Sequence, residues 1–274
     1  MGAGSAALSW VDGKDSRLPA ETQYGAGVSL DEVWRNVVGV QPAPAPLLVI
    51  ASAVVAFAAV AIRPVWRVVR TVVTIPHEGG HAAIALATGR RLSGVRLHSD
   101  ASGLTVSVGR PHGPGMIATA LAGYPAPALT GLAGAWMLAA GHITALLWIS
   151  ILLLACLLIA IRNGFGVVSV LVTGGAFFLV SWYGSADTQA AFAYAFVWFL
   201  LIASVRPVAD LQAGRRRGQG SDSDADQLAR LTGVPGILWV LLFGLISLGA
   251  LVSGAVLLWP YDLADLREAL PLPF

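Results

Sequence analysis

Two histidines and a glutamate, in the run His77-Glu78-Gly79-Gly80-His81, have the residue types and spacing needed for chemistry. On a helix, positions i and i+4 lie on one face about 6 Å apart along the axis, so both imidazoles can bind one metal ion. The H-E-x-x-H pattern is typical of zinc hydrolases, in which the glutamate takes a proton from the attacking water. The sequence therefore predicts zinc (Zn2+) as the cofactor, His77 and His81 as metal ligands, and Glu78 as the catalytic base.

The motif lies in apolar surroundings. Hydrophobic residues make up 56% of the 274-residue chain and charged residues only 12%. This composition is typical of integral membrane proteins. An ionisable side chain at the centre of a spanning helix costs roughly 3 kcal/mol, so three of them within about one turn indicate a function.

Apolar runs close to the roughly 20 residues that cross a bilayer predict an all-α polytopic membrane protein with about seven transmembrane helices, six to eight being compatible. The runs extend from Leu47 to Ile62, Val68 to Thr88, Met116 to Ala140, Ile143 to Ile161, Gly164 to Tyr183, Thr188 to Val205 and Gly236 to Leu258. After the metal-binding helix, residues 92–108 alternate as two short strands, which predicts a β-hairpin-like loop.

Composition divides the chain into four parts. Residues 1–46 are mixed and lack the pattern of a cleaved signal peptide, so we expect a partly flexible cytoplasmic segment. Residues 47–259 form the predicted integral membrane domain, which contains a polar cytoplasmic loop at residues 206–235. Residues 260–274 form a short C-terminal tail. The expected partners are a membrane-protein substrate and the lipid bilayer, with no nucleic acid.

The basic residues predict an orientation, because cytoplasmic loops are enriched in lysine and arginine. With seven spans and a cytoplasmic N-terminus, all of these residues except Arg63, Arg67, Arg70 and Arg267 fall inside. The active site then opens to the cytoplasm, although the first three of these exceptions conflict with the rule. Frequent arginine, alanine, glycine and valine are typical of GC-rich bacterial genes, so we expect a bacterial plasma membrane.

A catalytic zinc site has three protein ligands and one water, so one ligand must come from elsewhere. The candidates are Asp210, Asp222, Asp224, Asp226, His98, Asp100 and His112, with His142 and Asp187 on the opposite side of the membrane. Asp224 has the best local context, because Ala225 and Leu228 give it an apolar helical edge. The alternative, that the acidic run solvates a loop opposite the arginines at 215–217, stays open.

The motif within an early membrane helix resembles the site-2 protease family of intramembrane zinc metalloproteases, in a compact branch without an inserted peptide-binding domain. Softer agreement comes from Gly89-Arg90-Arg91, the stretches from Gly94 to Leu97 and from Gly103 to Thr105, Ala122-Gly123-Tyr124-Pro125, and Ser223-Asp224-Ala225 with Leu228-Ala229. The resemblance implies His77, His81 and Asp224 as zinc ligands and Glu78 as the base. Better-known members take the aspartate from a Leu-Asp-Gly motif, and no such tripeptide follows His81 here.

Tyr124, together with Pro125 and Pro127, interrupts the third apolar run. A phenol facing the metal could stabilise the oxyanion or contact the substrate, and the alternative is an ordinary packed tyrosine. The predicted function is hydrolysis of peptide bonds in membrane-spanning substrates by metal-activated water. Two other classes stay open, a non-proteolytic regulatory relative and a small metal or proton transporter.

Overall fold

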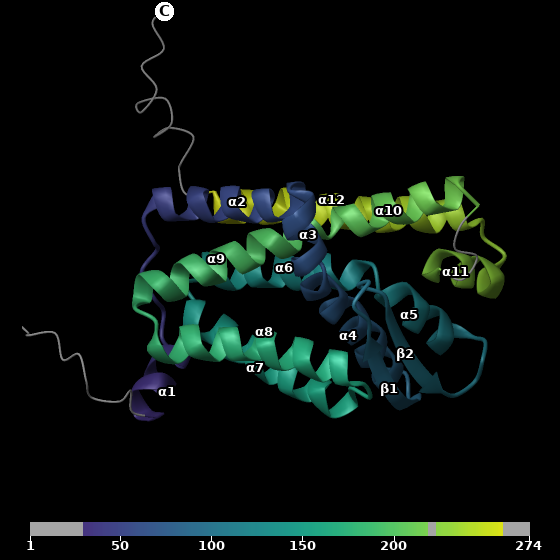
Figure 1. Ribbon diagram of the computed structural model, residues 1–274, viewed down its shortest axis with the longest axis horizontal. Coiled ribbons are helices and arrows are strands. Elements are labelled where there is room, and N and C mark those ends of the chain that lie inside the picture. Colours follow the sequence, from purple (N-terminus) through teal and green to yellow (C-terminus); the bar gives the residue numbers. More distant parts are fainter. Residues whose placement is uncertain (1–29, 219–222, 260–274) are drawn as a thin grey trace, which may run out of the picture.

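The computed structural model describes residues 30–218 and 223–259, which form helices and one two-stranded hairpin (Figure 1). The elements are α1 (Leu30–Val38), α2 (Pro46–Ala61), α3 (Arg63–Val69), α4 (Thr71–Ala87), β1 (Arg91–Leu97), β2 (Gly103–Val108), α5 (Pro114–Ala122), α6 (Pro125–Ala139), α7 (Ile143–Ala160), α8 (Gly164–Tyr183), α9 (Ala186–Ala203), α10 (Val205–Arg216), α11 (Asp224–Thr232) and α12 (Gly236–Leu258). The predicted mostly helical class is confirmed, and the predicted hairpin is present.

The described helices contain four to six candidate membrane spans. Helices α7, α8, α12 and the continuous pair α9 and α10 are each long and apolar enough to cross a bilayer. Two bent pairs pass the same test only when each is taken together: α2 with α3 and α4, bent by 95°, and α5 with α6, bent by 66°. The predicted count of seven is not confirmed. Helix α2 has only 16 residues, fewer than the roughly 20 that a span needs.

Contacts of α7 distinguish the two ends of the bundle. At the start of α7, the backbone N–H of Gln41 donates to the Gly141 carbonyl at 2.8 Å, and the Gln41 side-chain oxygen accepts from the Thr144 N–H at 3.2 Å. At the other end, the Arg162 N–H donates to the Val95 carbonyl of β1 at 2.9 Å. The hairpin therefore lies at one end of the bundle, and the segment before α2 lies at the other. We call these the hairpin end and the N-terminal end (Figure 1).

This arrangement differs from the expected topology, in which the N-terminal segment and the opening of the metal site shared one side. Helix α2 runs beside α9 in the same direction, since Ser52 bonds the Ala191 carbonyl and Arg206 bonds the Val60 carbonyl further along. The chain then bends by 95° at the hairpin end, and α4 does not return as a separate full span. Residues 30–46 therefore lie at the end of the bundle opposite the hairpin and α11. Residues 1–29 lie outside the described part.

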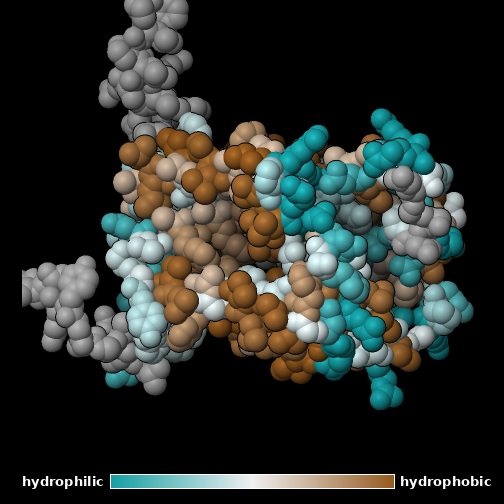
Figure 2. All heavy atoms as spheres, in the orientation of Figure 1, coloured by the Kyte–Doolittle hydropathy of each residue, from teal (hydrophilic) through white to brown (hydrophobic). Residues whose placement is uncertain are grey.

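Basic side chains mark the hairpin end. Every arginine of the described residues except Arg35 lies there: Arg63, Arg67, Arg70, Arg90, Arg91, Arg96, Arg110, Arg162, Arg206, Arg215, Arg216, Arg217 and Arg230. Figure 2 shows hydrophilic side chains gathered over this half of the molecule and hydrophobic ones over the other half. The bundle thus has one apolar half and one charged half.

In the core, glycines on two helices pack against a large side chain on a third. A Cβ added at Gly131 of α6 would lie 3.1 Å from the side chain of Leu201, and one at Gly254 of α12 would lie 2.5 Å from it. Leu201 of α9 is fully buried between these helices. Glycines at such crossings let helix backbones approach closely. Because lipid tails are as apolar as the helix surfaces, this close van der Waals packing, and not the hydrophobic effect, favours association of helices in a membrane.

The hairpin is fixed against the bundle through β1. Strands β1 and β2 pair antiparallel, with a register irregularity between Leu92 and Gly94. Asn163, in the turn between α7 and α8, accepts from the Leu97 N–H at 3.2 Å and donates to the Leu97 carbonyl at 2.6 Å. Both strands also contact α4, and β2 contacts it through Thr105 and Glu78.

The segment expected as a polar loop at residues 206–235 is largely helical. Helix α10 continues α9 beyond Ser204, and α11 follows the undescribed residues 219–222. Ala225 and Leu228 of α11 are fully buried, so packing overrides the polar composition from which a loop was inferred.

Candidate metal centre

Helix α4 brings the two histidines of the motif together. It spans Thr71–Ala87 and continues through Pro76, which lacks a backbone N–H and so removes one hydrogen-bond donor just before the motif. The Nε2 atoms of His77 and His81 lie 3.3 Å apart, as expected for side chains one turn apart on one face. Both lone pairs can therefore point to one position beside α4.

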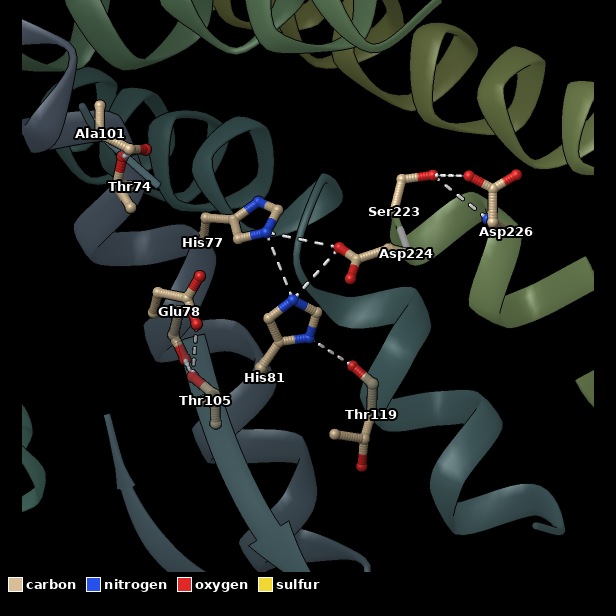
Figure 3. A network of polar contacts seen from close by, with 10 residues as sticks. All are labelled: Thr74, His77, Glu78, His81, Ala101, Thr105, Thr119, Ser223, Asp224 and Asp226. Atoms are coloured by element: carbon tan, nitrogen blue, oxygen red, sulfur yellow. Dashed lines mark hydrogen bonds and ion pairs between the residues drawn. The ribbon is translucent and has the colours of Figure 1, made fainter. Parts of the chain in front are cut away.

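Asp224 of α11 completes a triangle with these nitrogens (Figure 3). Its Oδ2 lies 3.4 Å from His77 Nε2 and 3.2 Å from His81 Nε2. In a tetrahedral zinc site with ligand atoms about 2.1 Å from the metal, neighbouring ligand atoms lie about 3.4 Å apart. The three measured edges match one face of such a tetrahedron, which leaves the fourth position for water or substrate. The donor set therefore fits a catalytic zinc ion.

Local sequence and packing place α11 at this position. The Ser223 hydroxyl caps the helix by accepting from the Asp226 N–H at 3.3 Å, and Gly233 ends the helix with a φ of 76°. Buried Ala225 and Leu228 pack in an apolar cluster with residues of α5 and α12. Asp224, as the first residue of the helix, is thereby held over α4.

An ion pair between Arg215 of α10 and Asp226 strengthens this attachment. Partial burial opposes the charged carboxylate of Asp226, but the Ser223 hydroxyl and the Arg215 guanidinium outweigh it and lower its pKa. In the same way, burial opposes the charge on Asp224, and hydrogen bonds with His77 and His81 overcome it and hold its pKa well below the usual range. Both carboxylates are therefore ionised at neutral pH.

The other candidate ligands lie elsewhere. Asp226 forms an ion pair with Arg215, and Asp210 lines the wall of a neighbouring cleft. Asp100 bonds Ser102 at the hairpin tip, which lowers the pKa of its carboxyl. Asp222 lies outside the described residues. Within the described part of the chain, the metal-ligand cluster contains His77, His81 and Asp224, with no other candidate.

His81 is oriented by its second ring nitrogen. Its Nδ1 lies 2.7 Å from the carbonyl of Thr119 on α5, and because a carbonyl only accepts, Nδ1 carries the proton. Nε2 then has its lone pair free for a metal. Such outer partners fix the tautomer and ring orientation of metal-binding histidines.

The break between α5 and α6 gives the ligands room. A Cβ added at Gly123 would lie 2.3 Å from His81 Nε2 and 2.7 Å from Asp224 Oδ2. A side chain here would therefore overlap the ligand atoms. Tyr124 follows directly, with its ring edge-on to His77 at 4.9 Å between centroids and stacked on Phe243 at 4.9 Å.

Glu78 is nearly buried, with 4% of its surface exposed, and faces β2. The Thr105 hydroxyl bonds Glu78 Oε2 at 2.6 Å (Figure 3). One turn earlier on α4, the Thr74 hydroxyl donates to the Ala101 carbonyl at 3.0 Å, so the hairpin tip is attached to the same helix. Glu78 is thus enclosed between α4 and the hairpin.

A cleft of about 320 Å³ opens beside the site. His77, Glu78 and Tyr124 contribute to its lining, and the remainder comes from the hairpin tip and the adjoining parts of α3, α4 and α10. It therefore gives access to the side chains of His77 and Glu78.

Comparison with known families agrees with this geometry. The model of the family described as Peptidase M50B-like matches residues 50–254. This chain belongs to that family. The resemblance to site-2 proteases is thereby confirmed, and the matched region includes both the α4 motif and Asp224. Neither the curated proteins nor the solved structures gave a match.

For several residues of this M50B-like site, the sequence alone does not show which groups they contact. Thr105 and Thr119 resemble any threonine of a strand or an apolar helix, and Gly103 resembles a turn glycine. Gly123 stands beside the tyrosine that attracted attention, yet its contact with the ligands depends on the bend between α5 and α6. Only the fold reveals these roles.

Proposed function

We propose that this M50B-like protein is an intramembrane zinc metalloendopeptidase that hydrolyses peptide bonds of membrane-spanning substrates. The proposal is carried by the ligand triangle of His77, His81 and Asp224, with edges of 3.2 to 3.4 Å, next to Glu78 in an open cleft. A base beside three ligands suits hydrolysis better than transport, which requires no proton acceptor at a fixed water.

The reaction divides between the metal and the chain. When bound, zinc supplies a Lewis acid that acidifies the attacking water and polarises the scissile carbonyl. Glu78 accepts the proton from that water and returns it to the leaving amine. Tyr124, on the cleft wall beside His77, contacts the substrate or the developing oxyanion.

A membrane-protein substrate must be unwound at the cleaved bond, because peptide groups in a membrane helix are already hydrogen-bonded. The cleft offers space for such a segment next to the hairpin tip, with the lipid bilayer around the apolar half of the bundle. We therefore propose cleavage near the membrane surface at the hairpin end.

We also propose that the hairpin end faces the cytoplasm of a bacterial cell. All described arginines except Arg35 support this orientation, including Arg63, Arg67 and Arg70, which conflicted with the seven-span topology. The site then opens to the cytoplasm as expected, whereas α1 lies on the other side of the membrane.

The catalytic proposal is tested with purified full-length protein in proteoliposomes, supplied with a quenched fluorescent library of apolar peptides and a single-span reporter protein. The wild type should cleave, and Glu78→Gln should lose at least about a hundredfold in rate while it retains zinc. Equal cleavage by both proteins would contradict the proposal. Zinc or proton flux without cleavage would favour a transporter, and neither activity would favour a regulatory relative.

The orientation is tested with single cysteines, since Cys156 is the only natural one. In a Cys156→Ser background, Ser99→Cys at the hairpin and Asn36→Cys at α1 should react with a membrane-impermeant maleimide from opposite sides of the membrane. Labelling of Ser99→Cys in intact cells would reverse the proposed orientation.

A further inference from the structure

Strand β2 presents small and polar residues to α4 and apolar residues away from it. Gly103, Thr105 and Ser107 are half-buried, whereas Leu104, Val106 and Val108 are 43 to 58% exposed. In a hairpin that only covered a core, the apolar set would face inward. The inward face of β2 is therefore suited to a polar group, and the group that it meets is the Glu78 carboxylate.

Two residues of this inward face contact Glu78. The Thr105 hydroxyl lies 2.6 Å from Glu78 Oε2 and 3.2 Å from the Glu78 carbonyl. A Cβ added at Gly103 would lie 2.2 Å from Glu78 Oε1 and 2.5 Å from its Cδ. Thr105 thus bonds one carboxylate oxygen, while the missing side chain of Gly103 leaves room for the other.

We propose that β2 positions the general base: Thr105 fixes Glu78 Oε2 by a hydrogen bond, and Gly103 leaves the space that Oε1 occupies. This inference rests on the proposed function, because it assigns positioning residues to the base of that reaction. The two residues are one strand period apart, so both reach one face of β2 and act on the same carboxylate.

The physical reason is the freedom of a glutamate side chain. Three rotatable bonds let an unbonded carboxylate occupy several rotamers, and proton transfer requires an oxygen within hydrogen-bond reach of the attacking water. A short bond to Oε2 selects one rotamer and leaves Oε1 as the oxygen that accepts the proton. Misplacement of a reacting group by about 1 Å can reduce the rate by about a hundredfold.

A purely structural role for Thr105 makes different predictions. The hydroxyl also lies near a helix carbonyl, so its loss could only loosen the hairpin from α4. In that case stability and zinc content would fall together with activity. Positioning of the base instead predicts a fall in kcat with unchanged zinc content, unfolding temperature and KM.

The test compares Thr105→Val and Thr105→Ser with Val106→Thr, which makes the reverse exchange at the neighbouring outward-facing residue. Each full-length variant is measured for cleavage of the best peptide of the fluorescent library, zinc content and unfolding temperature. We expect Thr105→Val to lose about tenfold or more in kcat at unchanged KM. Thr105→Ser should keep activity within about threefold because it retains the hydroxyl, and Val106→Thr should resemble the wild type.

Gly103→Ala provides a second, independent variant. Its methyl group displaces the flexible Glu78 side chain and not the backbone, so kcat should fall at least as far as in Thr105→Val. In a Glu78→Gln background, Thr105→Val should add little further loss, since the group that it positions is already disabled.

A readout without turnover separates the two proposals. Acetohydroxamate binds zinc and donates a proton to a neighbouring carboxylate, so its affinity reports the position of Glu78. Thr105→Val should weaken its binding several-fold, and Thr105→Ser should not. If no peptide is cleaved but this pattern holds, the proposed function fails and the positioning role stands. Equal hydroxamate affinity in the wild type and Thr105→Val, or equal losses in the valine and serine variants, would overturn the inference.

Discussion

The proposed zinc ligands come from two helices that pack against very different numbers of neighbouring elements. Helix α4 packs against α5, α6 and both strands, and it carries two of the proposed ligands and the proposed base within five residues. Helix α11 has nine residues, contacts α5 and α12, and carries only Asp224. The contrast shows that one half of the site is built into the bundle, whereas the other half is brought to it by docking of a short helix.

The position of Asp224 depends on the contacts that hold α11 against the bundle, and each of these contacts can be removed separately. Buried Leu228, the Ser223 cap and the pair between Arg215 and Asp226 together hold α11. Because local segments open with their own free energies, α11 should open at a lower cost than α4. Zinc, which bonds to both helices, should then couple them. Four predictions test this difference, from the largest effect to the smallest.

Removal of a ligand should have the largest effect. Asp224→Ala should weaken zinc binding by at least about a hundredfold, beyond the loss typical of an outer-shell partner. His81→Ala should do the same and also leave the Thr119 carbonyl without its donor. Zinc content after dialysis measures this loss. Asp210→Asn, on the cleft wall, is the matched control and should retain zinc.

Removal of zinc should release α11 and leave α4 in place. At zinc concentrations about a thousandfold above Kd, binding stabilises the docked state by about 4 kcal/mol. Hydrogen exchange with and without a chelator should therefore show a large loss of protection in residues 224–232 and little change in residues 71–87. Equal loss in both helices would contradict the proposed asymmetry.

Truncation of the buried contact should weaken docking directly. Leu228 is fully buried, so Leu228→Ala should cost about 3 kcal/mol, within the range for large-to-small core changes. The loss should appear as faster exchange of α11 and weaker zinc binding, with unchanged exchange in α7 and α8. Leu231→Ala, at a less buried position of the same helix, serves as the control and should have a smaller effect.

Loss of the ion pair should have the smallest effect. Arg215→Gln should destabilise docking by less than about 1 kcal/mol, since both side chains are partly exposed. The pKa of Asp226 is lowered from 3.8, so the contribution is present above that pH and disappears as the pH falls below it. The difference in α11 exchange between the variant and the wild type should therefore be greatest at pH 7 and should shrink as the pH falls below 3.8.

Much of the site was predictable because its elements are local. The spacing of His77 and His81 needs only an α-helix to bring two imidazoles to one face, and Glu78 follows from the same motif. The apolar runs likewise predicted helices over nearly the right residues. The hairpin followed from strict alternation within a short stretch. In each case the physical determinant acts over fewer than about 20 residues.

The remaining features depend on contacts between distant segments. Sequence preferred Asp224 over its neighbours only through an apolar helical edge and a family resemblance, whereas the structure brings its Oδ2 within 3.4 Å of both imidazoles. The 95° bend after α2 was not predicted, because run length alone does not show where a helix turns. The bond from Thr105 to Glu78 joins residues 27 positions apart, and no local pattern encodes it.

The sequence by itself determined the chemistry and its setting: two imidazoles and a carboxylate on one helix, within a chain apolar enough to enter a membrane. The tertiary structure decided which aspartate lies beside them, which strand contacts Glu78 and at which end of the bundle the cleft opens. The physical reason is range. Helical periodicity is a property of neighbouring residues, whereas docking of α11 and β2 onto α4 depends on packing between segments far apart in the chain.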